Sequence, residues 1–228
     1  MKKLVIIPAY NEEKSICTTV QDVLENAPGF DYVVINDCSK DHTLRVCHEN
    51  GLNVVDLPIN LGIGGAIQTG YRYAVENGYD VAVQFDGDGQ HDARFLQKMA
   101  DLLESESLDM VIGSRFIENE GFQSTGLRRM GIRFFEVFLR MLFGVRITDA
   151  TSGMRMCTRK VFEQFSMEYP QDYPEPETIA CLLRQKMKVA EIPVVMRERK
   201  AGVSSINPIK SIYYMIKVSM AILIERMR

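Results

Sequence analysis

Short apolar runs and amphipathic segments alternate along the first half of the chain. The apolar runs, rich in β-branched residues, lie at 3–7, 31–35, 53–57, 80–85 and 109–113. Between them, patterns typical of helices cover about 12–26, 41–50, 64–77 and 93–105. Strands that alternate with helices at this spacing are typical of βαβ units, whose parallel strands are covered on both faces. The pattern therefore predicts an α/β fold with a mostly parallel sheet and helices on both faces.

The second half departs from this rhythm. Helices are predicted at about 127–144, 159–165 and 176–187, a strand at 189–195, and a last helix just after Pro208. Proline is well tolerated in the first turn of a helix, because a backbone N–H at that position has no acceptor within the helix and its loss costs nothing. The segment 146–156, RITDATSGMRM, is predicted to be a loop. We interpret residues 1–205 as one domain and residues 206–228 as a C-terminal helical extension.

Composition narrows the class of protein. The chain has 228 residues, a net charge of -3 and five cysteines, none of them in a C-x-x-C pair. The charge argues against a general nucleic-acid binder, and the scattered cysteines fit reduced thiols in a cytosol better than a disulfide framework or a zinc site. No uncharged apolar stretch reaches about 18 residues, and the first apolar run is too short for a signal peptide. We expect a cytoplasmic protein without a spanning helix.

Polar clusters follow the predicted strands at their carboxyl ends. They lie at 8–13, 36–43, 60–67, 86–92 and 113–116. In open parallel sheets, ligands bind outside the carboxyl ends of the strands. Asp86 and Asp88 are separated by one glycine, so both carboxylates can face one Mg²⁺ or Mn²⁺ ion, with Gln90 or His91 as a further ligand. The alternative is a solvated turn, because Asp and Gly are common turn residues.

Seven segments, in this order, resemble the family 2 glycosyltransferases, and most closely those that act on polyprenyl (dolichol) phosphate. They are IIPAYNEE, VINDCSKDHT, NLGIGGAIQTGY, VQFDGDGQHD, IGSRF, TDATSGMRM and ERKAGVSS, between residues 6 and 205. The resemblance implies a GT-A (Rossmann-like) catalytic domain over 1–205, a nucleotide-sugar donor and a divalent metal, Mg²⁺ or Mn²⁺. It also implies transfer of a sugar to a polyprenyl-phosphate lipid with inversion.

The same resemblance assigns roles to individual residues. The donor site would comprise Pro8, Ala9, Tyr10, Glu12, Asp37, Asp86, Gly87 and Arg199, with Asp37 accepting a hydrogen bond from the base. The metal would be held by Asp86, Asp88 and Gln90, and the catalytic residues would be Asp88, Arg115 and Glu177. Two positions depart from the family pattern. Cys38 replaces a small Gly or an Asp, which leaves the choice of base open, and Ser205 replaces a Lys that would contact the diphosphate.

The need for a general base depends on the acceptor. Glu175 and Glu177 lie near the position where relatives that glycosylate hydroxyls keep a catalytic acid. A lipid phosphate is already an anion and needs no base, and both glutamates would then simply suit the first turn of a helix. The alternatives to a polyprenyl-phosphate acceptor are a hydroxyl of a growing cell-surface glycan, or a catalytically silent homologue that binds a membrane partner.

Two helical segments, 129–143 and 209–227, are apolar around most of their circumference. Such helices are usually buried, so the two segments could pack on each other and on the sheet. Alternatively they insert partly into a bilayer surface, with arginines near lipid phosphates. We expect a peripheral enzyme at the inner face of the cell membrane. A separate small membrane protein or a second copy of the chain are the other partners considered for these helices.

Overall fold

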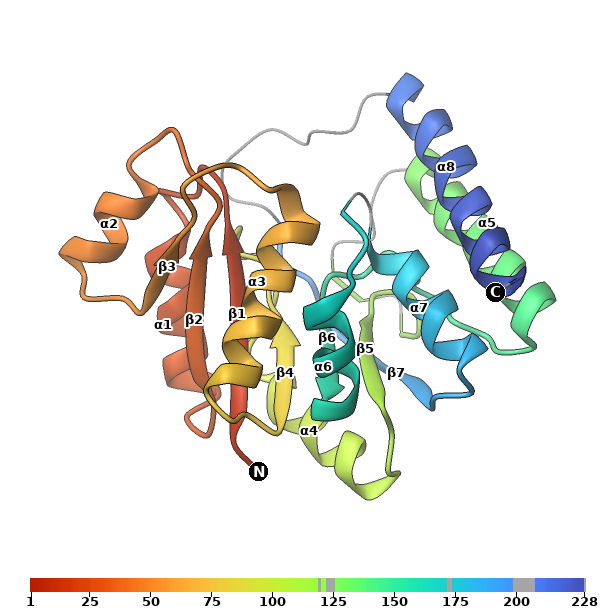
Figure 1. The fold of residues 1–228 in the computed structure, drawn as a ribbon, viewed down its shortest axis with the longest axis horizontal. Helices are drawn as coiled ribbons and strands as arrows, with labels where there is room; N and C mark the ends of the chain where they lie inside the picture. The colour runs from red at the N-terminus through yellow and green to blue at the C-terminus, as the bar shows by residue number, and fades with distance from the viewer. Residues whose placement is uncertain (119, 122–125, 172–173, 199–207, 228) are drawn as a thin grey trace.

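Seven strands form one sheet in the order β3-β2-β1-β4-β6-β5-β7 (Figure 1). The computed structural model describes residues 1–118, 120–121, 126–171, 174–198 and 208–227. The strands are β1 (Lys3–Ala9), β2 (Asp31–Asn36), β3 (Val54–Asp56), β4 (Val81–Gln84), β5 (Met110–Ser114), β6 (Arg155–Thr158) and β7 (Val189–Pro193). Every neighbouring pair is parallel except the two pairs that include β6, so the mostly parallel sheet is confirmed.

Helices cover both faces of this sheet, as predicted. They are α1 (Ile16–Asn26), α2 (Thr43–Glu49), α3 (Gly62–Glu76), α4 (Phe95–Ser105), α5 (Gly126–Phe143), α6 (Arg159–Met167), α7 (Pro174–Arg184) and α8 (Pro208–Met227). Along β1, Leu4 and Ile6 join a core with α3, α6 and α7, while Val5 and Ile7 join a core with α1 and α4. Because successive side chains of a strand point to opposite faces, a strand buried on both faces reads as one continuous apolar run.

Strand β6 corrects the sequence prediction, which assigned 146–156 to a loop. It runs antiparallel between β4 and β5, with Gln84 opposite Arg155 and Val111 opposite Met156. Only four residues long, β6 contains a fully buried arginine, so its own sequence carries little strand signal. Its backbone pairing with β4 and β5 makes it a strand. Because β6 is antiparallel, the loop that precedes it reaches the same sheet edge as the carboxyl end of β4.

Helices α5 and α8 lie side by side beyond α7 (Figure 1). Phe135 of α5 packs edge-on against Tyr214 of α8, with 5.6 Å between ring centroids. Glu225 of α8 pairs with Arg184 of α7 at 2.8 Å. Each helix therefore buries one face in the core. In the described part of the chain, no helix has the length and apolar character needed to cross a membrane.

Candidate active site

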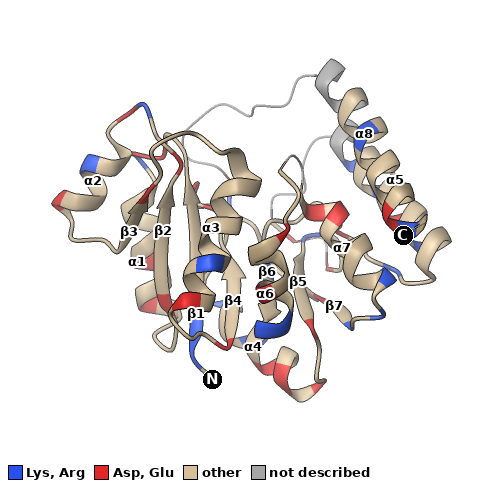
Figure 2. Ribbon diagram, viewed as in Figure 1, with Lys and Arg blue, Asp and Glu red and all other residues tan. Residues whose placement is uncertain are grey.

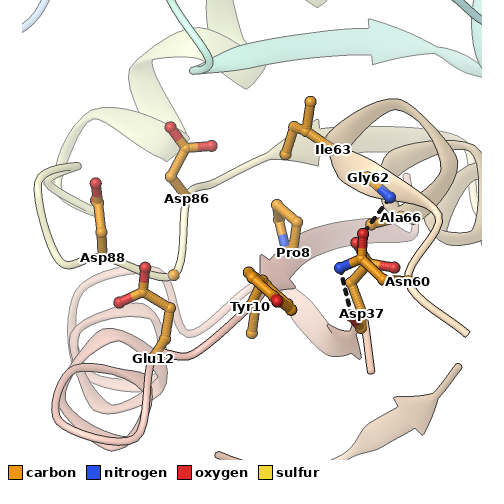
Figure 3. A pocket seen from close by; sticks show the side chains of 12 residues that line it. Pro8, Tyr10, Glu12, Asp37, Asn60, Gly62, Ile63, Ala66, Asp86 and Asp88 are labelled. Carbon is orange, nitrogen blue, oxygen red and sulfur yellow. Dashed lines mark hydrogen bonds between the residues drawn. The ribbon is translucent and has the colours of Figure 1, made fainter. Parts of the chain in front are cut away.

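A cavity of about 360 Å³ opens at the carboxyl ends of β1, β2 and β4. It is lined by Pro8, Ala9, Tyr10, Glu12, Asp37, Asn60, Gly62, Ile63, Ala66, Asp86, Gly87 and Asp88. The strand register brings these segments together, because Ala9 lies opposite Asn36 and the Asp37 N–H donates to the Ala9 carbonyl at 2.9 Å. Figure 3 shows Glu12, Asp86 and Asp88 at one end of the cavity and Asp37 and Asn60 at the other.

The turn after β4 presents two carboxylates to the cavity. The Asp86 N–H donates to Nδ1 of His91 at 3.0 Å, and the buried His91 ring packs edge-on against Phe85. The Gln90 N–H donates to Asp88 Oδ1 at 3.0 Å, which closes the turn. Asp86 and Asp88 are thus held by local hydrogen bonds on one side of the same cavity.

Two glycines make room for this turn. An added Cβ at Gly87 would lie 2.9 Å from the Pro8 carbonyl oxygen, so only glycine allows the turn to approach β1 so closely. An added Cβ at Gly153, in the loop before β6, would lie 2.7 Å from Asp86 Oδ2. The TDATSGMRM segment therefore borders the Asp86 carboxylate directly.

The donor set fits a hard divalent cation that also binds substrate. Within the described residues, no group of three or more His, Cys, Asp or Glu side chains is gathered as a complete protein cage. Mg²⁺ usually takes only one or two carboxylates and completes its shell with water and substrate phosphates. Asp86 and Asp88, both lining a cavity with room for such a substrate, meet that requirement.

Gln90, the third predicted metal ligand, does not line the cavity. Its side-chain Nε2 donates to the backbone carbonyl of Arg197 at 3.3 Å. The backbone carbonyl of Gln90 accepts the Arg197 N–H at 2.8 Å. The side chain thus lies between the acidic turn and the segment that follows β7.

Asp37 has a structural partner that the sequence did not reveal. Its buried carboxylate accepts the N–H groups of Leu61 and Gly62 at 2.7 and 2.9 Å, at the start of α3. The Asn60 amide in turn donates to the Asp37 carbonyl at 2.9 Å (Figure 3). Asp37 therefore anchors the α3 entry to the cavity wall. This anchoring brings in four residues that we did not assign to the site: Asn60, Gly62, Ile63 and Ala66. Their signal was the NLGIGGAI segment after the third predicted strand.

Arg115 lies beside the site rather than on the cavity wall. Its guanidinium forms two hydrogen bonds with Asp149, Nε to Oδ2 at 2.6 Å and Nη2 to Oδ1 at 2.7 Å. Nη2 also donates to Thr151 Oγ1 at 3.1 Å. The loop that carries these partners is held by the partly buried Glu191, which accepts the N–H groups of Thr148 and Asp149. Burial raises the pKa of the Glu191 carboxyl, although these hydrogen bonds oppose the shift.

The remaining predicted residues are divided between α7 and the undescribed part of the chain. Glu175 and Glu177 are in the first turn of α7, where negative charge is favourable, and neither lines the described cavity wall. The Glu175 carbonyl accepts a hydrogen bond from the buried Arg155 of β6. Arg199 and Ser205 lie outside the described residues.

A second, smaller cavity of about 220 Å³ lies against α5. Its lining comprises Phe116, Arg129, Ile132, Arg133, Glu136, Arg146 and Thr148. Arg146 pairs with Glu136 at 2.8 Å, and the Arg129 guanidinium stands 5.5 Å from the centre of the Phe116 ring. Three arginines at one hollow favour an anionic ligand.

Comparison with known proteins extends these observations. A profile of glycosyl transferase family 2 matches residues 4–166. An undecaprenyl-phosphate mannosyltransferase from Micrococcus luteus is 28% identical over 216 residues, which cover 91% of this chain and 88% of that protein. A polyprenol monophosphomannose synthase from Mycolicibacterium smegmatis is also 28% identical, over 90% of this chain and 81% of that protein.

Solved structures agree on the fold. Glucosyl-3-phosphoglycerate synthase from Mycobacterium tuberculosis, in complex with Mn²⁺, UDP and phosphoglyceric acid, superimposes with a TM-score of 0.70 at 18% identity. The match covers 99% of this chain and 78% of that one. The predicted resemblance and fold are both confirmed. The chain belongs to glycosyl transferase family 2 and is a glycosyltransferase with the GT-A fold.

Proposed function

We propose that this enzyme is a metal-dependent, inverting transferase that moves a sugar from a nucleotide diphosphate to a polyprenyl-phosphate lipid at a membrane surface. The observation that carries the proposal is the cavity with Asp86 and Asp88 at one end and Asp37 and Asn60 at the other. A nucleoside diphosphate needs a polar contact for its base at one end and a cation for its diphosphate at the other. The names of the Micrococcus and Mycolicibacterium relatives support a polyprenyl-phosphate acceptor.

In this proposal the two ends of the cavity bind different parts of the donor, the base and the diphosphate. Asp37 and Asn60 contact the base, while Pro8, Ala9 and Tyr10 line the middle of the pocket. Asp86 and Asp88 would hold Mg²⁺ or Mn²⁺ on the donor diphosphate, and Gln90 would supply a further oxygen ligand. Glu12 and Gly87 complete the wall, and Arg199 is proposed to face the diphosphate.

The reaction exchanges one C–O bond for another. A phosphate oxygen of the acceptor attacks the anomeric carbon on the face opposite the leaving group, so the configuration inverts. The bond from that carbon to the diphosphate breaks, and its electron pair leaves with the nucleoside diphosphate. A cation held by Asp86 and Asp88 would supply positive charge for the leaving diphosphate, where such charge stabilises the transition state more than the ground state. No proton has to be removed, because the acceptor is already an anion.

The membrane part of the proposal comes from α5 and α8. Their outward faces expose large apolar side chains: Met130, Phe134, Val137 and Met141 on α5, and Tyr213, Ile216, Met220, Leu223 and Ile224 on α8. Figure 2 shows that most of α8 carries neither acidic nor basic residues. A polyprenyl tail is insoluble in water, so the reactive phosphate stays at the bilayer surface. Apolar side chains next to the arginine-lined hollow suit binding to that surface.

A donor panel tests the proposed function. UDP-, GDP- and dTDP-sugars are each incubated with Mn²⁺ or Mg²⁺ and a short polyprenyl phosphate, and products are identified by mass. We expect one donor to yield a glycosyl-phosphoryl lipid. Transfer only to a hydroxyl acceptor, in an enzyme that loses activity when Glu175 or Glu177 is replaced, would favour the glycan alternative instead.

A further inference from the structure

The segment that follows β7 crosses the acidic turn and contacts it through Arg197. The Arg197 N–H donates to the Gln90 carbonyl at 2.8 Å, and the Arg197 carbonyl accepts from Gln90 Nε2 at 3.3 Å. The first bond joins the two main chains, and the second holds the Gln90 carboxamide through its nitrogen end. The carbonyl oxygen Oε1 is then the end of the carboxamide that remains suited to ligate a cation.

The Arg197 side chain anchors this contact to two other elements. Nη1 and Nη2 meet the two oxygens of Asp22, on α1, at 3.1 and 3.2 Å. Nη2 also lies 3.2 Å from Oδ1 of Asp92, which is almost fully buried at the end of the turn. Asp22 Oδ2 accepts the Ala93 N–H at 3.0 Å as well. One guanidinium thus joins α1, the end of the acidic turn and the segment after β7.

We propose that Arg197 is a positioning residue, which holds Gln90 where its carboxamide oxygen reaches the cation on the donor diphosphate. This inference rests on the proposed function. Arg197 acts through Gln90, since its own guanidinium is directed at Asp22 and Asp92. Partners that orient metal ligands are commonly needed for metal affinity, and their loss typically costs about 10–100-fold.

Arg94 offers a matched control within the same cluster. Its guanidinium also pairs with Asp92, with Nη2 2.5 Å from Oδ2. The described hydrogen bonds and ion pair of its side chain all go to Asp92 and none to Gln90, and the side chain is largely exposed. Arg94→Ala therefore removes a positive charge beside the same carboxylate and leaves the Gln90 contact in place.

The test measures Mn²⁺ binding by electron paramagnetic resonance of the free ion, with saturating UDP and, in parallel, GDP. We expect the Kd for Mn²⁺ to rise about tenfold or more in Arg197→Ala and in Gln90→Ala. Arg94→Ala should change it by about twofold at most, because Asp92 keeps its pair with Arg197 and the contact with Gln90 stays in place. The double variant Gln90→Ala with Arg197→Ala should bind no more weakly than either single variant, because both act through one ligand.

Arg197→Lys keeps the test decisive if Arg197→Ala does not fold. A lysine keeps the charge but cannot bridge two carboxylates, so its Kd should fall between those of the wild type and Gln90→Ala. A Kd equal to that of the wild type in Arg197→Lys or Arg197→Ala would overturn this inference but not the proposed function. The same holds if the losses of affinity in the two single variants add up in the double variant. Absence of Mn²⁺ binding by the wild type with either nucleotide would overturn the metal assignment itself, and the inference with it.

Discussion

Arg115 and Asp149 form a buried ion pair with two parallel hydrogen bonds, of 2.6 and 2.7 Å. The guanidinium that sequence resemblance assigned to catalysis is thus bound to a carboxylate of its own chain. Asp149 lies in the loop that brings Gly153 against the carboxylate of Asp86. The pair therefore connects the end of β5 to the loop that borders the proposed metal site.

Arg115→Ala should destabilise the fold by about 3–5 kcal/mol, because it leaves the Asp149 carboxylate buried without its cation. The free energy of unfolding in urea measures this loss. The control is Arg159→Ala, which breaks the exposed pair with Glu163 and should cost about 0.3–0.5 kcal/mol. If Arg115→Ala unfolds at the wild-type urea concentration but loses sugar transfer, the arginine has the catalytic role that the sequence predicted.

Gly153→Ala should weaken metal-dependent donor binding and lower turnover by about a hundredfold. The added methyl group would lie 2.7 Å from Asp86 Oδ2 and must displace that carboxylate, and small misplacements of reacting groups are costly. Nucleotide affinity with and without Mn²⁺, together with turnover, measures the effect. The control is Gly131→Ala, whose added Cβ would make only an ordinary contact, 3.8 Å from Met215 Sδ. Equal metal dependence in both variants would contradict the geometry of the metal site.

Asp37→Asn should reduce both stability and nucleotide affinity. An amide keeps one acceptor oxygen but turns an NH₂ group toward an N–H of Leu61 or Gly62, which costs about 1–3 kcal/mol when the group is buried. Urea unfolding and nucleotide titration measure the two losses. Asp41→Asn is the control, because Asp41 accepts bonds from Thr43 and Glu13 but does not line the cavity. Unchanged nucleotide affinity in Asp37→Asn would mean that the base binds elsewhere.

The wild-type protein should float with anionic liposomes, and less so as salt rises. Val137→Glu with Met141→Glu should abolish flotation without unfolding the protein, because these side chains are 54% and 75% exposed. Phe138 suits this test less well, since it packs against the core. Met167→Glu, at an exposed position on α6, is the control and should float normally. If the wild-type protein does not float with liposomes, the membrane assignment is wrong, and the exposed faces of α5 and α8 bind another partner.

The sequence predicted the architecture well where local pattern and tertiary role coincide. The strands β1, β2, β4 and β5 read as apolar runs because both their faces are buried, and the polar clusters after β1, β2 and β4 do meet at one cavity. Strand β6 was not predictable in this way, since its ladder comes from neighbours distant in sequence. The Asp37 contact with the start of α3 and the Asp149 partner of Arg115 likewise depend on tertiary proximity. A motif identified these residues, but it did not reveal what already binds them.

The most direct test of the central claim compares two lipid acceptors that differ only in the terminal phosphate. The enzyme, its best nucleotide-sugar donor and Mn²⁺ are incubated with a polyprenyl phosphate or with the matching polyprenol, and labelled sugar in the lipid fraction is counted. We predict transfer to the phosphate alone, its loss in excess chelator, and a fall of about a hundredfold or more in Asp88→Asn. Transfer to the free alcohol, or full transfer to the phosphate in chelator, would contradict the account.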